Sequence, residues 1–179
     1  MTNRRSFMLG ASVVLTRAAL PAALAAFQAS TATARDQRKA VFFSKEEMDT
    51  LQALVDVILP ATDSPAASAA DTHWFIDSAI FECATQPEQK ALRAGVQELK
   101  NLRYATLPAD EQIKLLRERA KADMELPYEK SFFKILKDYT MAGYFLSEIG
   151  ATQALAYDKV PGGYQGDLPL APNQKAWTL

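Results

Sequence analysis

The sequence has little of what catalytic and metal sites are built from. Its 179 residues include one histidine, His73, and one cysteine, Cys83. Zinc and iron–sulfur sites need several convergent ligands, which one histidine and a distant cysteine cannot supply. The sequence also lacks a GxSxG motif, a CxxCH motif for haem attachment and a glycine-rich nucleotide motif between a strand and a helix. These absences argue against a serine hydrolase, a metalloenzyme and a nucleotide-binding enzyme.

The two rare residues have ordinary structural interpretations. His73 lies beside Trp74 at a predicted helix start, which favours a partly exposed packing or capping residue over a ligand. Cys83 follows Phe75 and Ala79 at helical spacing, so we expect a small buried hydrophobic residue and not a reactive thiol. Because one cysteine cannot form an intramolecular disulfide, stability has to come from packing.

The first 34 residues contain no acidic side chain. Their only charges are Arg4, Arg5 and Arg17, a composition typical of a targeting segment. The apolar stretch 8–15 ends before it reaches the roughly 18 consecutive residues of a membrane span. A cleavable signal over residues 1–34 is therefore predicted. AxA patterns at 23–25 and at 32–34 offer two cleavage sites, and the sequence leaves the choice between them open.

The start of this segment carries a more specific pattern. Arg4 and Arg5 are followed by Phe7 and Met8, which resembles the twin-arginine export signal. The resemblance implies that the Tat translocase exports the folded chain across the bacterial inner membrane, which would place it in the periplasm. An ordinary secretory signal that happens to contain two arginines is the alternative interpretation.

The residues after Ala34 have the length and charge of one acidic globular domain. They carry 17 of the 20 basic residues and all 21 acidic residues, a net charge of −4. No basic cluster with interleaved aromatic residues is present, so nucleic acid is not an expected partner. Five segments show helical periodicity and none shows strand alternation. They lie between Ser44 and Pro60, Asp71 and Cys83, Pro87 and Leu99, Pro108 and Ala120, and Pro127 and Gly143. We predict an all-α fold, a single small domain of five to six helices over residues 35–156.

Residues 157–179 form a different kind of segment. Three prolines and three glycines predict an extended, irregular tail. The tail nevertheless contains Tyr164, Trp177 and several aliphatic residues, which a freely solvated tail would lack. It is therefore expected to pack on the helical domain or on a partner.

Aromatic residues near helix ends and in the tail are the candidate contacts with a partner. Tyr144, Phe145, Tyr164 and Trp177 could provide large contact area at low entropic cost. Glu148 lies among apolar neighbours, where a buried carboxylate would need a pairing group, so we favour a structural or interface role over catalysis. Aromatic residues at helical spacing, Phe132, Phe133 and Tyr139, are instead expected in the core.

Several stretches of the sequence resemble the gluconate 2-dehydrogenase subunit 3 family. They are LVDVILPATDSP at 54–65, TMAGYFLSEIGAT at 140–152, YDKVPGGYQGDLPL at 157–170 and KAW at 175–177. The second and third stretches, in this order and spacing, are the most specific. The segment between residues 86 and 121 is generic helix and contributes little to the resemblance.

The resemblance implies a non-catalytic small subunit of a membrane-associated dehydrogenase complex. The partner would be a large flavoprotein of the glucose-methanol-choline type, which carries FAD and oxidises a sugar, sugar acid or polyol. A multihaem cytochrome c subunit would accept the electrons. This chain would bind no cofactor itself, and it would escort a large subunit that lacks its own signal through twin-arginine export.

Two other functions remain open from the residues alone. One is a free-standing periplasmic helical module whose tail encloses a small ligand. The other is a small hydrolase that uses Glu148 or His73, although the supporting catalytic groups are missing.

Overall fold

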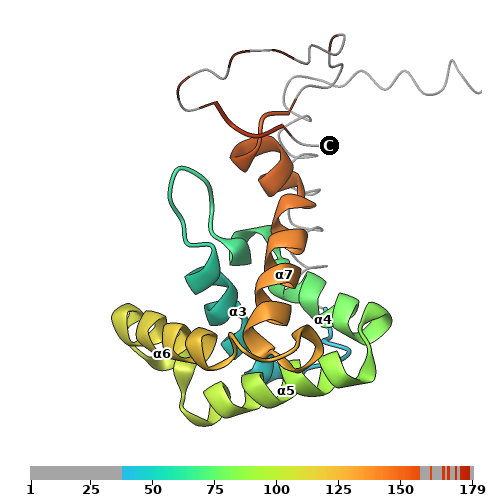
Figure 1. The fold of residues 1–179 in the computed structure, drawn as a ribbon, viewed down its shortest axis with the longest axis vertical. Helices are drawn as coiled ribbons and strands as arrows, with labels where there is room; N and C mark the ends of the chain where they lie inside the picture. The colour runs from blue at the N-terminus through green and yellow to red at the C-terminus, as the bar shows by residue number, and fades with distance from the viewer. Residues whose placement is uncertain are drawn as a thin grey trace, which may run out of the picture. The chain divides into compact units, whose positions relative to one another are not determined.

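The computed structural model describes residues 38–157 and, within the tail, residues 162, 167, 169, 172 and 174–177. One compact unit, Ala40–Leu179, contains the described helices (Figure 1). The predicted export signal with Arg4, Arg5 and Phe7 lies outside the described residues, and so does Tyr164.

The described residues form α-helices and short helical turns, without a β-strand (Figure 1). The α-helices are α3 (Lys45–Ile58), α4 (Thr72–Cys83), α5 (Gln86–Asn101), α6 (Ala109–Ala122) and α7 (Phe132–Phe145). Single 3-10 turns cover Ala67–Ala70, Tyr104–Thr106 and Tyr128–Lys130, and a π-helical turn, Gly150–Ala154, follows α7. The prediction of an all-α domain of five to six helices is confirmed.

Local sequence signals account for most helix boundaries. A capping box starts α3: the Ser44 N–H donates to Glu47 Oε2 over 2.8 Å, and the Glu47 N–H donates to Ser44 Oγ over 3.3 Å. One boundary differs from the prediction. Pro127 precedes a 3-10 turn, and α7 begins only at Phe132, where Ser131 Oγ accepts from the Lys134 N–H.

The capping carboxylate of Glu47 makes stability depend on pH. Burial raises its pKa, but hydrogen bonds from Ser44 and Gln97 and the charge of Lys100 outweigh burial, so the pKa lies below 4.5. A carboxyl group whose pKa is lower in the folded than in the unfolded state stabilises the protein above the unfolded pKa. This contribution is lost as the pH falls through the folded pKa.

Glu47→Gln is therefore expected to lower the free energy of unfolding at pH 7 by about 0.5 to 1 kcal/mol, because the glutamine keeps an acceptor but loses the charge. The difference from wild type should shrink as the pH falls from 7 to 3, because the contribution of the carboxylate is lost as the pH falls through its lowered pKa. Urea unfolding of wild type and of Glu47→Gln at pH 7 and at pH 3 measures the difference in the free energy of unfolding. An equal difference at both values would show that the charge contributes nothing.

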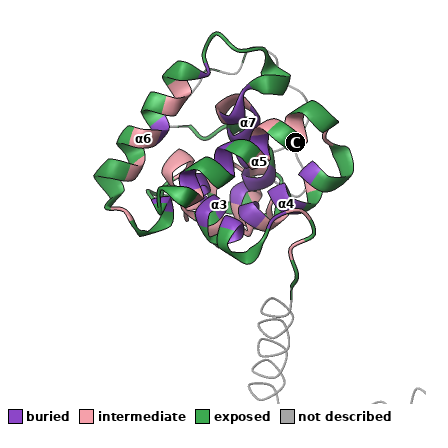
Figure 2. Cartoon of the chain, turned by 90° about the horizontal axis from the view of Figure 1, so that it is seen from below, coloured by how far each residue is buried: buried purple, intermediate pink, exposed green. Residues whose placement is uncertain are grey.

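The core lies between α3, α4, α5 and α7 (Figure 2). Leu51 and Leu54 of α3 and Leu136 of α7 have no exposed surface. Helix α6 lies at the edge, and Leu116 is its one buried residue. As predicted, three aromatic residues of α7 belong to the core: Phe132 is 1% exposed, and Phe133 and Tyr139 pack against the buried cluster.

Candidate partner-binding surface

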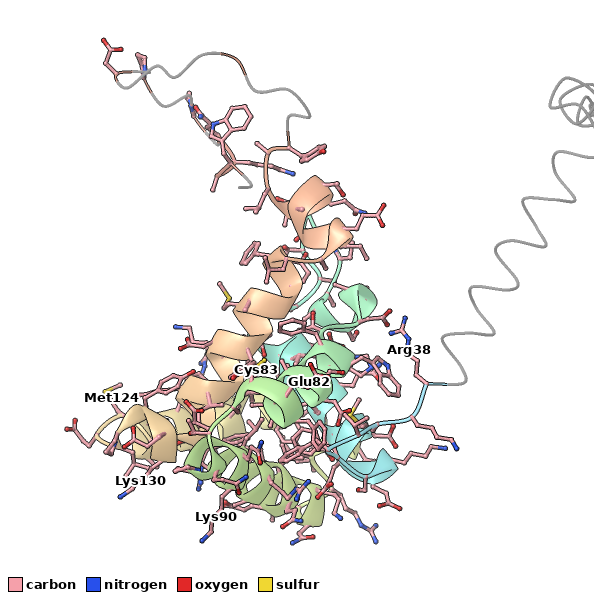
Figure 3. All side chains as sticks on the ribbon, turned by 90° about the vertical axis from the view of Figure 1, so that its right-hand side faces the viewer. Arg38, Glu82, Cys83, Lys90, Met124 and Lys130 are labelled. Atoms are coloured by element: carbon pink, nitrogen blue, oxygen red, sulfur yellow. The ribbon has the colours of Figure 1, made fainter. Side chains whose placement is uncertain are left out.

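Helix α4 buries polar residues and exposes phenylalanines. Thr72 and Asp77 are 0% and 1% exposed, whereas Phe75 and Phe81 are 38% and 56% exposed. The predicted buried face of this helix, Phe75, Ala79 and Cys83, is therefore wrong. Cys83 is exposed at the C-terminal end of α4 (Figure 3), and His73, predicted to be partly exposed, is buried.

The carboxylate of Asp77 explains why α4 takes this orientation. Its Oδ2 accepts from the Val41 N–H over 2.7 Å, and its Oδ1 accepts from the N–H groups of Phe42 and Phe43 over 3.0 and 2.8 Å. Three charge-assisted hydrogen bonds offset the cost of burying a carboxylate. The donors lie 34 to 36 residues away in the sequence. No local pattern around Asp77 could have indicated them.

The ring of Phe75 packs on Gly143 of α7, and a residue larger than glycine would not fit at position 143. A Cβ atom built on Gly143 would lie 2.5 Å from Cδ1 of the Phe75 ring, so the missing side chain permits this close contact. Leu146, one turn further along, is 77% exposed, and Ala142 is exposed beside it. We use the name α4–α7 face for five of the exposed residues of α4 and of the C-terminal part of α7, namely Phe75, Ser78, Phe81, Ala142 and Leu146.

The C-terminal end of α7 is fixed to the loop that follows α3. Tyr144 is 2% exposed, and its hydroxyl donates to the Pro65 carbonyl over 2.8 Å. Its ring packs edge-to-face on Phe145, which is half-buried, with 5.3 Å between the ring centroids. Tyr144 therefore holds two segments of the domain together, and its buried ring does not offer contact area to a partner.

Glu148 lies immediately beyond α7, and it is exposed. The expected burial of this carboxylate among its apolar neighbours is therefore wrong. Of its apolar neighbours, Leu146 is exposed and Ile149 packs against the core. Exposure makes Glu148 accessible to another protein, and its interface role stays a prediction.

A tight turn redirects the chain after α7. Ser147 Oγ donates to the Tyr144 carbonyl over 2.6 Å and accepts from the Gly150 N–H over 3.0 Å. The Leu155 N–H then donates to the Gly150 carbonyl over 3.0 Å, which closes the π-helical turn. A Cβ atom on Gly150 would lie 1.9 Å from the Tyr144 carbonyl oxygen and 2.9 Å from the Phe145 Cα. The backbone therefore admits only glycine here.

Gly150→Ala is expected to lower the free energy of unfolding by about 1 to 3 kcal/mol, because the end of α7 has to open to accept the methyl group. Gly162→Ala is the matched control, since a Cβ atom there meets nothing within 4 Å. It should change stability by about 0.5 kcal/mol or less. Urea unfolding of the two variants measures the difference. Equal stabilities would mean that the turn does not constrain the fold.

The end of the chain returns to this turn. The Ala156 N–H donates to the Ala176 carbonyl over 2.8 Å, Ala156 and Trp177 form a parallel β-bridge, and Lys175 Nζ donates to the Gln153 carbonyl. The side chains of Tyr157 and Trp177 are both 58% exposed. Two aromatic side chains are thus displayed beside the end of α7.

Three of the stretches that carry the family resemblance meet in this region. The Tyr144–Pro65 hydrogen bond joins 140–152 to 54–65, and the Ala156–Trp177 bridge brings 175–177 beside the turn after α7. This region is the upper part of the unit in Figure 1, whereas α5 and α6 lie in its lower part. Three of the four stretches are therefore close together in space, and most of the remaining stretch, 157–170, lies outside the described residues.

Elsewhere in the domain, the phenol of Tyr128 has a raised pKa. Burial, together with the charges of Asp138 and Glu88 and a hydrogen bond to Asp138, raises the pKa of Tyr128 to about 12, so its phenol is protonated at neutral pH. Within the described residues, no group of three or more His, Cys, Asp and Glu side chains is placed to hold a metal ion. A search of the same residues finds no helix of the length and apolar character needed to cross a membrane.

The chain belongs to the gluconate 2-dehydrogenase subunit 3 family, whose sequence model matches residues 45–162. The match begins with α3 and includes α4, α7 and the turn after α7. The family name implies an accessory subunit of a dehydrogenase complex. No curated protein and no solved structure matches the chain.

Proposed function

We propose that this chain is the non-catalytic small subunit of a periplasmic flavin-dependent dehydrogenase complex. It binds a large subunit of the glucose-methanol-choline type, which holds FAD and oxidises a sugar, sugar acid or polyol. It stabilises that subunit and escorts it through twin-arginine export. The observation that carries the proposal is the orientation of α4, which exposes Phe75 and Phe81 in a chain of this family.

The physical support is the type of surface that the fold displays. Exposed phenylalanines next to buried polar residues on one helix reverse the usual pattern of a soluble domain, and such apolar surface is typical of a protein-binding site. Ser78 and Ala142 are exposed as well, and their small side chains would leave room for side chains of a partner. Phe145, Glu148 and Trp177, at the adjoining end of α7, extend the proposed interface.

The division of labour in the complex follows from the same proposal. FAD belongs to the large subunit, and a third subunit, a multihaem cytochrome c, receives the electrons. This chain then needs no cofactor site of its own. Its association with the inner membrane would be peripheral and would depend on the other subunits.

Purification of the affinity-tagged chain from its own cells tests the proposal. We expect a large, yellow flavoprotein to co-purify in a constant ratio, and we expect the chain expressed alone to show no flavin or haem absorbance. A chain that is monodisperse and stable without any partner, with Trp177 protected from solvent, would instead support the free-standing binding module.

A further inference from the structure

A groove with a volume of about 680 Å³ lies between α5 and the segment that precedes α3. We call it the α5 groove. Phe42 of the preceding segment lines it, together with residues of α5 that include Pro87, Lys90, Arg93 and Gln97. All of the lining residues lie in the part of the chain that the structure describes, and none of them is acidic. The groove therefore combines apolar surface with charges of one sign, which is positive.

The guanidinium of Arg93 is held in position in this groove. Its Nη2 donates to the Phe42 carbonyl, and its central carbon lies 3.8 Å from the centre of the Phe42 ring. A guanidinium has five N–H donors, so donors remain for a further contact. Because the group is already fixed, it would lose little conformational entropy on binding a carboxylate, and its planar shape suits two parallel hydrogen bonds.

Lys90 adds a second positive charge on the same side of α5. It lies three residues before Arg93, and it is exposed (Figure 3). Neither side chain forms an ion pair with a carboxylate of the described ranges 38–157 and 174–177. The two cations are thus available to an anionic group, although the chain after Ala34 has a net charge of −4.

The α5 groove adjoins the α4–α7 face at the C-terminal end of α4. Gln89, which also lines the groove, donates from Nε2 to the Ile80 carbonyl over 2.9 Å. On the other side of the groove, the Phe42 N–H donates to Asp77 Oδ1 over 3.0 Å. Phe81 follows Ile80 and lies one helical turn after Asp77, on the same side of α4. One partner can therefore cover the exposed ring of Phe81 and reach the groove.

We propose that the α5 groove binds a segment of the large subunit in which an acidic side chain stands next to an apolar one. The carboxylate pairs with Arg93 and Lys90, and the apolar side chain packs on Pro87 and Phe42. Residues 1–34 of this chain contain no acidic side chain, so charge complementarity points to another protein as the occupant. This inference rests on the proposed function, and it adds a contact that selects for charge to the apolar α4–α7 face.

Titration of the purified large subunit with the Lys90→Glu variant tests the inference. We expect the variant to bind about tenfold more weakly than wild type, because the new carboxylate repels the acidic side chain of the partner. Lys114→Glu is the matched control, since Lys114 is an exposed lysine of α6 and the substitution changes the net charge equally. It should bind as tightly as wild type. Addition of salt to about 0.5 M should weaken binding by wild type more than binding by Lys90→Glu.

Carbodiimide cross-linking of the complex identifies the bound segment. The reagent joins a lysine amine to a carboxylate that contacts it and takes up the water that is released. We expect mass spectrometry to find Lys90 joined to an aspartate or glutamate of the large subunit. The Lys90→Arg variant keeps the charge but lacks the amine, so it should retain the affinity and lose the cross-link.

Wild-type affinity in Lys90→Glu would overturn the inference, and so would an equal loss of affinity in Lys114→Glu, because the effect would then be one of overall charge. A cross-link from Lys90 to a second copy of this chain or to its own tail, in place of the large subunit, would also overturn it. If the wild-type chain binds no large subunit at all, the proposed function fails instead, and that result needs no variant.

Discussion

Phe75→Glu and Phe81→Glu are each expected to weaken binding of the large subunit by about a hundredfold, or about 2.7 kcal/mol. Both side chains lie on the α4–α7 face, where the fold leaves phenylalanine rings exposed. A carboxylate at either position would have to be desolvated against apolar surface without a pairing group. Titration of the purified subunits against each other measures the loss.

Ile113→Glu is the matched control for this prediction. Ile113 lies on α6, and its exposure of 36% nearly equals the 38% of Phe75. The same substitution there should leave binding unchanged and shift stability by about 0.5 kcal/mol or less. Because Phe75 also packs on α7 and Phe81 is more exposed, the Phe81 variant separates lost binding from lost stability. If both α4 variants bind the large subunit as tightly as wild type, the α4–α7 face is not part of the interface.

Replacement of Arg4 and Arg5 by lysine is expected to leave both this chain and the large subunit in the cytoplasm. The twin-arginine signal depends on the two guanidinium groups, and lysine keeps the charge but not the planar donor geometry. Immunodetection of both proteins in periplasmic and cytoplasmic fractions measures the effect.

Two results separate the possible routes of export. Replacement of Arg17 by lysine should change nothing, because this residue lies outside the twin-arginine pattern. A large subunit that reaches the periplasm in the presence of the double variant travels independently of this chain, which would contradict the escort role. Export of this chain alone in the double variant would favour an ordinary secretory signal.

The sequence predicted where the helices lie along the chain better than it predicted which side of each helix is buried. Helix α3 is defined by local features, the capping box of Ser44 and Glu47 and the stop at Pro60, and these need no tertiary information. Helix α4 shows the opposite case. Its spacing suggested that Phe75 and Cys83 are buried, but the three donors for Asp77 come from a distant segment, and they decide which side of the helix faces inward.

The interface role of the candidate aromatic residues stays a prediction, and the structure gives only their exposure. Phe145 is partly exposed and Trp177 is exposed, whereas Tyr144 is buried and its hydroxyl donates to the Pro65 carbonyl. An aromatic residue at a helix end can pack on a partner or on its own domain. For Tyr144 the hydrogen bond to Pro65, 79 residues away in the sequence, decides that the ring is buried in its own domain. The exposure of Phe75 and Phe81 was missed because a helical wheel shows which residues share a face but does not show which face is covered.

The mass and flavin content of the purified assembly test the central claim most directly. We predict that native mass spectrometry of the chain purified from the periplasm shows it bound to one large subunit that carries FAD. After the two subunits are separated, the flavin should stay with the large subunit, and this chain should be colourless. A periplasmic chain found alone, or one that retains flavin after separation, would contradict the claim that it acts as a binding and export subunit.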